Sequence, residues 1–366
     1  MRRLRILTLV SLLLAIVIFV IKNRSPSTVS SGKGLLVDKA WLTSNQHPQT
    51  PPAGLRPPDQ TFLTYPEWFL VFSPAEQANY FKIRTSTTFP YMKHVDQMWG
   101  GYEVMYDQIK DNFPFNTGYH LMIMVIAGST TVEYSIKSFY ETIIGRITDT
   151  DPNEEMTFED KFNADYEHSY VKFIEALPWY QYDFNHQLKT LWSNSSLSGP
   201  HLLRKLERRY YLTTELLVKS SYGWLIGLAT KSAYETASLQ TTVVMEKLPA
   251  GLDTSGLVHN LKKLPNGRVL ANLPRYSEFN TSVNKLAKEG VRFKEIAGNT
   301  GAIMLTILTN KPLVSLNRNY KVLFVQPIVT KPGLNRIAIV TTVGNLSTTL
   351  KMLSYDNVTI EHVYDY

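Results

Sequence analysis

The sequence predicts an α+β protein with an N-terminal transmembrane helix, a mainly helical middle domain and a C-terminal ferredoxin-like domain. Three observations support this. Residues 4–21 form an almost unbroken apolar run. Apolar residues then recur with helical spacing between 61 and 245. From 255 to 366 the pattern changes to short apolar runs separated by turns rich in Gly, Pro and Asn, which is typical of strands.

The apolar run at residues 4–21 has the length of a membrane-spanning helix. At about 1.5 Å per residue it extends roughly 27 Å, close to the roughly 30 Å hydrocarbon core of a bilayer. It ends in bulky and charged residues rather than in a small-residue cleavage site, so we interpret 1–24 as a transmembrane anchor and not as a cleaved signal peptide. Arg2, Arg3 and Arg5 lie at the start of the run, and the positive-inside rule then places the N-terminus in the cytoplasm. We therefore expect a single-pass protein of the bacterial inner membrane with a periplasmic body.

Charge and cysteine content exclude several classes of function. The net charge is +7, but five of the positive charges flank the anchor, which leaves 33 Lys and Arg against 31 Asp and Glu in the remainder. This distribution suits anionic lipid headgroups and argues against a nucleic-acid partner, which would need a basic patch on the folded body. The chain contains no cysteine, so disulfides and thiolate metal sites are excluded.

Residues 25–60 are rich in Pro and Ser and predict an extended tether between the anchor and the body. Within the helical domain, capping-box patterns at Thr64 and Ser73 predict two helix starts, and Asp151 begins a third. Further helices are expected at 181–192 and from Leu202 to about Thr236.

Residues 133–148 predict an amphipathic helix. Ile136, Tyr140, Ile143, Ile144 and Ile147 lie on one apolar face, which we expect to be buried. Three charged residues at i, i+4 spacing lie on another face, which we interpret as solvated: Glu133, Lys137 and Glu141.

The charge-free stretch at 113–132 raises the alternative of a second membrane span. Its strongly apolar core covers only Leu121 to Ala127, so we favour a buried helix or strand. Whether it spans is left open by the sequence.

The C-terminal region predicts the order β-α-β-β-(β-β)-α-β, the outline of a split βαβ fold with additional strands. The expected elements are a strand at 268–273, a helix at 276–290, strands at 292–297, 303–308, 320–329 and 334–343, a helix at 345–353 and a strand at 358–366. The ending from Asn345 to Leu353 and from Val358 to Tyr364 resembles the last helix–strand unit of ACT-type regulatory domains. That resemblance implies a small-ligand or oligomerisation module.

Two Asp-x-x-His motifs are the sharpest candidates for chemistry. Asp165 with His168, and Asp183 with His186, each place a carboxylate and an imidazole one helical turn apart. The motifs resemble the Glu-x-x-His pairs of ferritin-like di-iron proteins, which implies an iron, manganese or zinc site. Pro178 interrupts the helix between the two motifs, and the alternative is that both are solvated polar faces. A second candidate, His94-x-Asp96, is either a metal-binding or acid–base pair or a hydrogen-bonded turn.

The whole pattern, including Thr64-Tyr65-Pro66-Glu67-Trp68 and Leu225-Ile226-Gly227, resembles membrane-anchored bacterial envelope proteins of unknown function. We expect a non-catalytic binding or assembly protein with no cofactor and with a protein partner or a second copy of the chain. The alternatives are a metal-dependent enzyme that uses the Asp-x-x-His residues and a ligand-sensing module in the C-terminal domain.

Overall fold

The computed structural model describes residues 30–31, 37–43, 45–150, 155–196, 198–233, 239–249, 251–252, 256–311, 318–355 and 358–365. The predicted anchor, residues 1–24, lies outside this range. The fold class is α+β, as predicted. The body has two compact units. The helical unit comprises Trp68–Val95 and Gly128–Ala237, and the sheet unit comprises Ser25–Glu67, Asp96–Ala127 and Ser238–Tyr366. The units therefore interleave along the chain, whereas the sequence predicts two consecutive domains.

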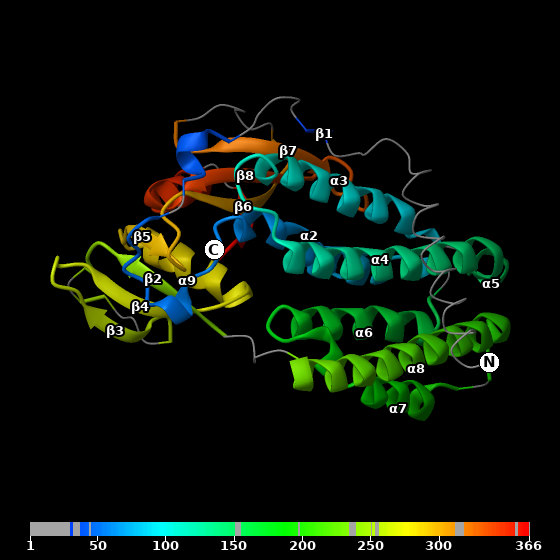
Figure 1. Ribbon diagram of the computed structural model, residues 1–366. Coiled ribbons are helices and arrows are strands. Elements are labelled where there is room, and N and C mark those ends of the chain that lie inside the picture. Colours follow the sequence, from blue (N-terminus) through cyan, green and yellow to red (C-terminus); the bar gives the residue numbers. More distant parts are fainter. Residues whose placement is uncertain are drawn as a thin grey trace. The chain divides into compact units, whose positions relative to one another are not determined.

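The principal helices of the described residues follow one another in the first two thirds of the chain (Figure 1). They are α2 (Gln60–Phe81), α3 (Tyr91–Ile109), α4 (Thr117–Tyr140), α6 (Phe158–Ile174), α7 (Phe184–Asn194) and α8 (Leu202–Ala233). A π-helical turn (Glu141–Gly145) joins α4 to the short α5 (Arg146–Thr148). In the described part of the chain, no helix combines the length and the apolar character needed to cross a bilayer.

Two of the predicted helix starts need correction. The capping-box residues Thr64 and Ser73 both lie inside the single helix α2, where the Thr64 hydroxyl donates to the carbonyl of Gln60 at 2.6 Å. Helix α6 begins at Phe158, because the side chain of Thr157 accepts a hydrogen bond from the backbone N–H of Asp160 and caps it. The predicted start at Asp151–Glu154 lies outside the described residues.

The sheet unit contains two repeats of one topology, β-β-β-α-β. The first consists of β2 (Gln240–Met245), β3 (His259–Lys263), β4 (Val269–Pro274), α9 (Ser277–Lys288) and β5 (Phe293–Ile296). The second consists of β6 (Ala302–Thr309), β7 (Lys321–Pro327), β8 (Asn335–Thr342), α10 (Leu346–Tyr355) and β9 (Thr359–Val363). The sheet orders are β3-β4-β2-β5 and β7-β8-β6-β9, and β1 (Ser30–Ser31) adds to the edge of the second sheet beside β7. All the strand pairs are antiparallel, so each repeat ends in a split β-α-β whose two strands flank the first strand of the repeat.

The repeat is visible in the sequence once the topology is known. One constant spacing along the chain relates six apolar positions of the first repeat to six of the second. The pairs are Phe279 and Leu346, Val283 and Leu350, Leu286 and Leu353, Val291 and Val358, Phe293 and Ile360, and Ile296 and Val363. Eleven of these residues are buried in one core that both sheets and both helices share, and Ile360 packs against it. The predicted order of elements is therefore correct from 268 onward, but the strands form two sheets rather than a single ferredoxin-like one.

Segments before α2 pack on the sheet unit. The carboxylate of the buried Glu295 accepts the backbone N–H groups of Gln49 and Thr50 at 2.9 and 3.0 Å. The Arg56 N–H donates to the carbonyl of Ala297 at 3.0 Å. Residues 45–59 are therefore part of the folded body, not of a free tether, because sheet residues satisfy their backbone groups.

The start of α2 and the second half of α3 cover the larger sheet. The Tyr65 hydroxyl donates to the side-chain carbonyl of Gln326 on β7 at 2.8 Å, and the Gln326 amide donates to the backbone carbonyl of Gln97 at 3.2 Å. Arg336 on β8 donates to the same Gln326 oxygen at 3.2 Å and pairs with Glu361 on β9 at 2.7 Å. A buried polar layer thus fixes this face of the sheet.

Candidate functional site

The four predicted metal ligands do not converge. Asp183 is the N-cap of α7, and its carboxylate accepts the backbone N–H of His186 at 2.9 Å. The side chains of Asp165 and His186 are exposed, and His168 is half-buried. Among the residues that the structure describes, no three His, Asp or Glu side chains are grouped so that they could hold one metal ion. The geometry gives the metal site no support, and it stays a prediction.

His94 and Asp96, the second candidate, are both buried. The Nδ1 of His94 and the Ser73 hydroxyl form a hydrogen bond of 2.9 Å, and the Nε2 of His94 lies 3.6 Å from the carboxylate of Glu76. The Ser73 hydroxyl also lies 2.7 Å from the hydroxyl of Tyr134. This serine–histidine–glutamate set is packed beneath aromatic rings, with Phe89 at 4.7 Å from His94 between ring centroids. Together with Tyr134, these side chains connect α2, α3 and α4, and this contact between helices is a structural role.

The interior of the helical unit is rich in paired charges. Helix α4 and the π turn place Glu133, Lys137 and Glu141 at i, i+4 spacing, and antiparallel α8 places Lys219, Glu215 and Arg208 opposite them. The pairs are Glu133–Lys219 at 3.5 Å, Lys137–Glu215 at 2.9 Å and Glu141–Arg208 at 2.6 Å. Because the charges alternate along each helix, this register brings every charge opposite its complement.

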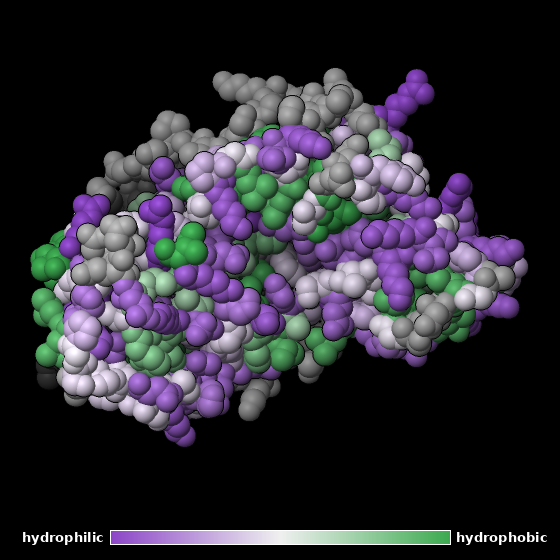
Figure 2. All heavy atoms as spheres, turned by 180° about the vertical axis from the view of Figure 1, so that it is seen from behind, coloured by the Kyte–Doolittle hydropathy of each residue, from purple (hydrophilic) through white to green (hydrophobic). Residues whose placement is uncertain are grey.

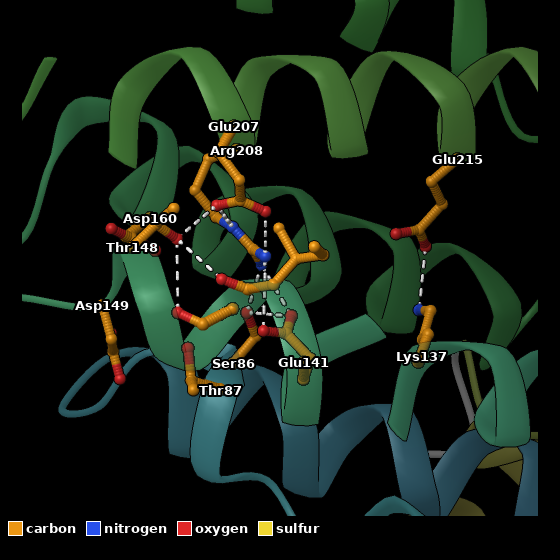
Figure 3. A network of polar contacts seen from close by, with 12 residues as sticks. Ser86, Thr87, Lys137, Glu141, Thr148, Asp149, Asp160, Glu207, Arg208 and Glu215 are labelled. Atoms are coloured by element: carbon orange, nitrogen blue, oxygen red, sulfur yellow. Dashed lines mark hydrogen bonds and ion pairs between the residues drawn. The ribbon is translucent and has the colours of Figure 1, made fainter. Parts of the chain in front are cut away.

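Arg208 is the centre of the most densely bonded part (Figure 3). The side chain is completely buried. Its guanidinium donates to both oxygens of Glu141 at 2.6 and 3.2 Å and to both oxygens of Glu207 at 2.7 and 2.5 Å. It also donates to the Ser86 hydroxyl at 2.8 Å, and Ser86 in turn donates to Glu141 at 2.8 Å. The planar fork of arginine suits such bidentate pairing.

Arg204 extends the network one turn towards the start of α8. Its guanidinium holds Asp160 of α6 with two bonds, at 2.7 and 3.2 Å, and donates to Thr87 at 3.3 Å. Gly145 in the π turn is part of the same arrangement, because a Cβ there would collide with the Glu141 carboxylate. The network therefore ties α4, α6, α8 and the turn at 86–88 together.

Electrostatics differ between the carboxyl groups around Lys137 and Lys219. Burial raises the pKa of Glu215, but the two ammonium groups outweigh burial and lower it to about 2. Burial dominates at Glu167 and raises its pKa above the usual value, although the same two lysines oppose the shift. Glu167 is therefore the carboxyl of this group that binds a proton first as the pH falls.

The apolar face at 133–148 is exposed, whereas the sequence predicts that it is buried. Ile136, Ile143 and Ile147 are 62%, 44% and 72% exposed, whereas Lys137 and Glu141 are buried. The interpretation of the charged face as solvated is thus wrong. A helix pattern shows two faces but not which of them has a partner, and here α8 supplies complementary charges for the polar face.

The sheet unit contains an open hollow of about 400 Å³. It is lined by Asn45, His47, Gln49, Arg268, Lys294, Glu295, Thr300 and Gly344. Arg268 and Lys294 belong to the first repeat and Gly344 to the second, so the hollow lies where the repeats meet. Arg268 donates to the Gln49 side chain at 3.0 Å, and Lys294 pairs with Glu246 at 2.6 Å. Two cations thus stand at the hollow, while backbone N–H groups bind the Glu295 carboxylate.

In comparisons with known proteins, no family model matches the chain, and neither a curated protein nor a solved structure matches it significantly.

Proposed function

We propose that this chain is a membrane-anchored, non-catalytic binding protein of the bacterial envelope, with residues 1–24 as a single-pass anchor and the body in the periplasm. The observation that carries the binding role is the polar hollow at the junction of the two repeats. Arg268 and Lys294 stand at its wall, a setting that suits a small ligand with a carboxylate or phosphate group.

The packing around the hollow supports this proposal. Glu295 is buried and fully engaged by Gln49 and Thr50, so its charge is compensated without the two cations. The ACT-like resemblance of the C-terminal end also implies a ligand or oligomerisation module. Each repeat supplies one split β-α-β rather than the whole ferredoxin-like fold.

The first experiment is a native mass spectrum of the full-length protein, extracted from its own membrane in mild detergent. A bound small molecule or additional subunits would support the proposal, and a bare monomer would contradict it. In the Arg268→Ala/Lys294→Ala variant we expect the bound small molecule to be lost. Lys262→Ala/Lys263→Ala on the exposed strand β3 is the matched control and should retain it.

The metal-dependent enzyme is a separate alternative with its own outcome in the same spectrum. One or two iron, manganese or zinc ions per chain, lost in the His168→Ala/His186→Ala variant, would favour it over the binding role.

A further inference from the structure

The outer face of α8 is uncharged along most of its length. Between Leu202 and Leu225, where every side chain is described, no exposed residue is charged, and most are apolar or aromatic, among them Leu203, Leu206, Tyr210, Leu217, Val218 and Trp224. This stretch is about 36 Å long at about 1.5 Å per residue.

Most of the charges of α8 with described side chains are turned inward instead, and Lys205 is half-buried. Arg204, Glu207, Arg208 and Arg209 are buried, and the side chains of Glu215 and Lys219 are only 9% and 16% exposed. The neighbouring helix α4 has a similar distribution towards its end, although the side chain of Glu133 is 40% exposed. Between 128 and 144 its exposed residues are Ser129, Ile136, Phe139, Thr142, Ile143 and Ile144.

This distribution is the reverse of that of a helix at a water-exposed surface, which places its charges outward. Burying an ion is costly unless it is paired, and here the chain pairs its buried ions with one another. Helices in contact with lipid show this arrangement, because a charge directed at hydrocarbon is the more expensive alternative.

Basic residues adjoin one end of this surface. Lys82, Arg84 and Arg146 are exposed near the end of α4 and the start of α8. Hydrogen bonds show that these segments meet, because Thr87 accepts from Arg204 and Thr148 donates to Glu207 at 3.1 Å. Hydrophobic atoms gather at the left edge of Figure 2, which is the side of α5 and the start of α8.

Trp224 and Tyr222 lie towards the other end of the face on α8. Basic residues attract anionic headgroups, and Trp and Tyr favour the interfacial zone of a bilayer. The combination of a charge-free length, basic residues at one end and aromatic residues at the other identifies a lipid surface as the occupant.

We propose that the outer face of α8, together with the exposed face of α4 from Ile136 to Ile147, contacts an anionic lipid bilayer. This contact is a second one, separate from the anchor at residues 1–24, and it rests on the proposed function only in placing the chain at a membrane. It does not require the hollow or its ligand.

The absence of cysteine makes a direct test possible. Single cysteines at Leu203→Cys and Leu217→Cys report on the proposed face, and Tyr355→Cys, at an 85% exposed position of the sheet unit, is the control. Each full-length variant is labelled with an environment-sensitive fluorophore and reconstituted into vesicles of phosphatidylcholine with phosphatidylglycerol. We expect blue-shifted emission and strong quenching by nitroxide-labelled lipids at 203 and 217, and neither effect at 355.

Quenching at 203 and 217 no stronger than at 355 would overturn the proposal. A blue shift without lipid quenching that grows with protein density would identify a second copy of the chain as the occupant and would also overturn it. Vesicle flotation separates this test from the proposed function. A chain that floats with unquenched labels contradicts only the lipid face, whereas a chain that does not float contradicts the anchor as well.

The basic end gives a second readout in the Leu203→Cys background. We expect Lys82→Glu/Arg84→Glu/Arg146→Glu to lose the difference in quenching between vesicles with and without phosphatidylglycerol. The matched control, Lys262→Glu/Lys263→Glu/Lys331→Glu, reverses three exposed charges of the sheet unit and should keep that difference. Equal behaviour of the two triple variants would show that headgroup charge does not guide this face.

Discussion

The two units of this protein bury opposite kinds of side chain. In the sheet unit, α9 and α10 turn residues such as Val283 and Leu350 into a common apolar core. In the helical unit, α4 and α8 turn Lys137, Glu141 and Arg208 inward and expose isoleucine and leucine. The sheet unit gains stability mainly by removing apolar surface from water. The interior of the helical unit depends in addition on complete pairing of its ions, so it is more sensitive to the loss of a single partner.

The largest expected effect is the loss of one partner in the buried network. Arg208→Ala removes the counter-ion of the buried Glu141 and leaves Glu207 with Arg204 alone, at 3.6 Å. We expect the variant to cost about 3–5 kcal/mol of unfolding free energy. Denaturant titration of the full-length protein in detergent measures it. Arg84→Ala, at an exposed position, is the control and should change stability by less than about 0.5 kcal/mol.

A double replacement sharpens this result. Glu141→Leu/Arg208→Met removes both charges and should recover much of the loss, because neither ion is left unpaired. A double variant as unstable as the single one would mean that the pair itself contributes the stability.

In the sheet unit the comparable damage comes from loss of volume. Leu346→Ala removes a fully buried side chain from the shared core, and we expect a cost of about 2–5 kcal/mol. Leu353→Ala, at another fully buried position of α10, should behave similarly, and Leu261→Ala on the exposed strand β3 should have little effect. Equal tolerance at the buried and exposed positions would contradict a common core.

Acid should weaken the helical unit first. The pKa of Glu215 is lowered from 4.5 to about 2 in the folded chain, so its contribution is fully present above pH 4.5 and is lost as the pH falls towards 2. At about 1.4 kcal/mol per pH unit this is at most about 3 kcal/mol. Unfolding free energies at several pH values measure it, and Glu215→Gln should flatten the profile. Glu155→Gln, which affects only an exposed pair with Lys161, should leave the profile unchanged.

The sequence predicted the sheet unit better than the helical one. Strands and helices after residue 268 follow from alternating apolar patterns and turn residues, because each element buries its apolar side. The two-sheet pairing could not be predicted, since the apolar spacing that relates Phe279 to Leu346 acquires meaning only with the topology. In the helical unit the pattern at 133–148 was correctly identified, but its burial was inverted. The complementary charges of α8 lie far along the chain, and nothing local indicates that they pair with Glu133, Lys137 and Glu141. The Asp-x-x-His motifs show the opposite case. Their local spacing suggested a shared site, but the fold does not group the side chains of the two motifs.

The smallest expected effect concerns the exposed apolar face of α8, where two adjacent residues can be compared. Leu216 is completely buried, and Leu217 is 48% exposed. Leu216→Lys places an unpaired charge in the core and should destabilise the fold severely, whereas Leu217→Lys should change the unfolding free energy in detergent by less than about 0.5 kcal/mol. Denaturant titration of the two variants gives the comparison. A large loss for Leu217→Lys would mean that the outer face of α8 is packed against protein in the folded chain, and the helical unit would then not differ from the sheet unit in the way proposed.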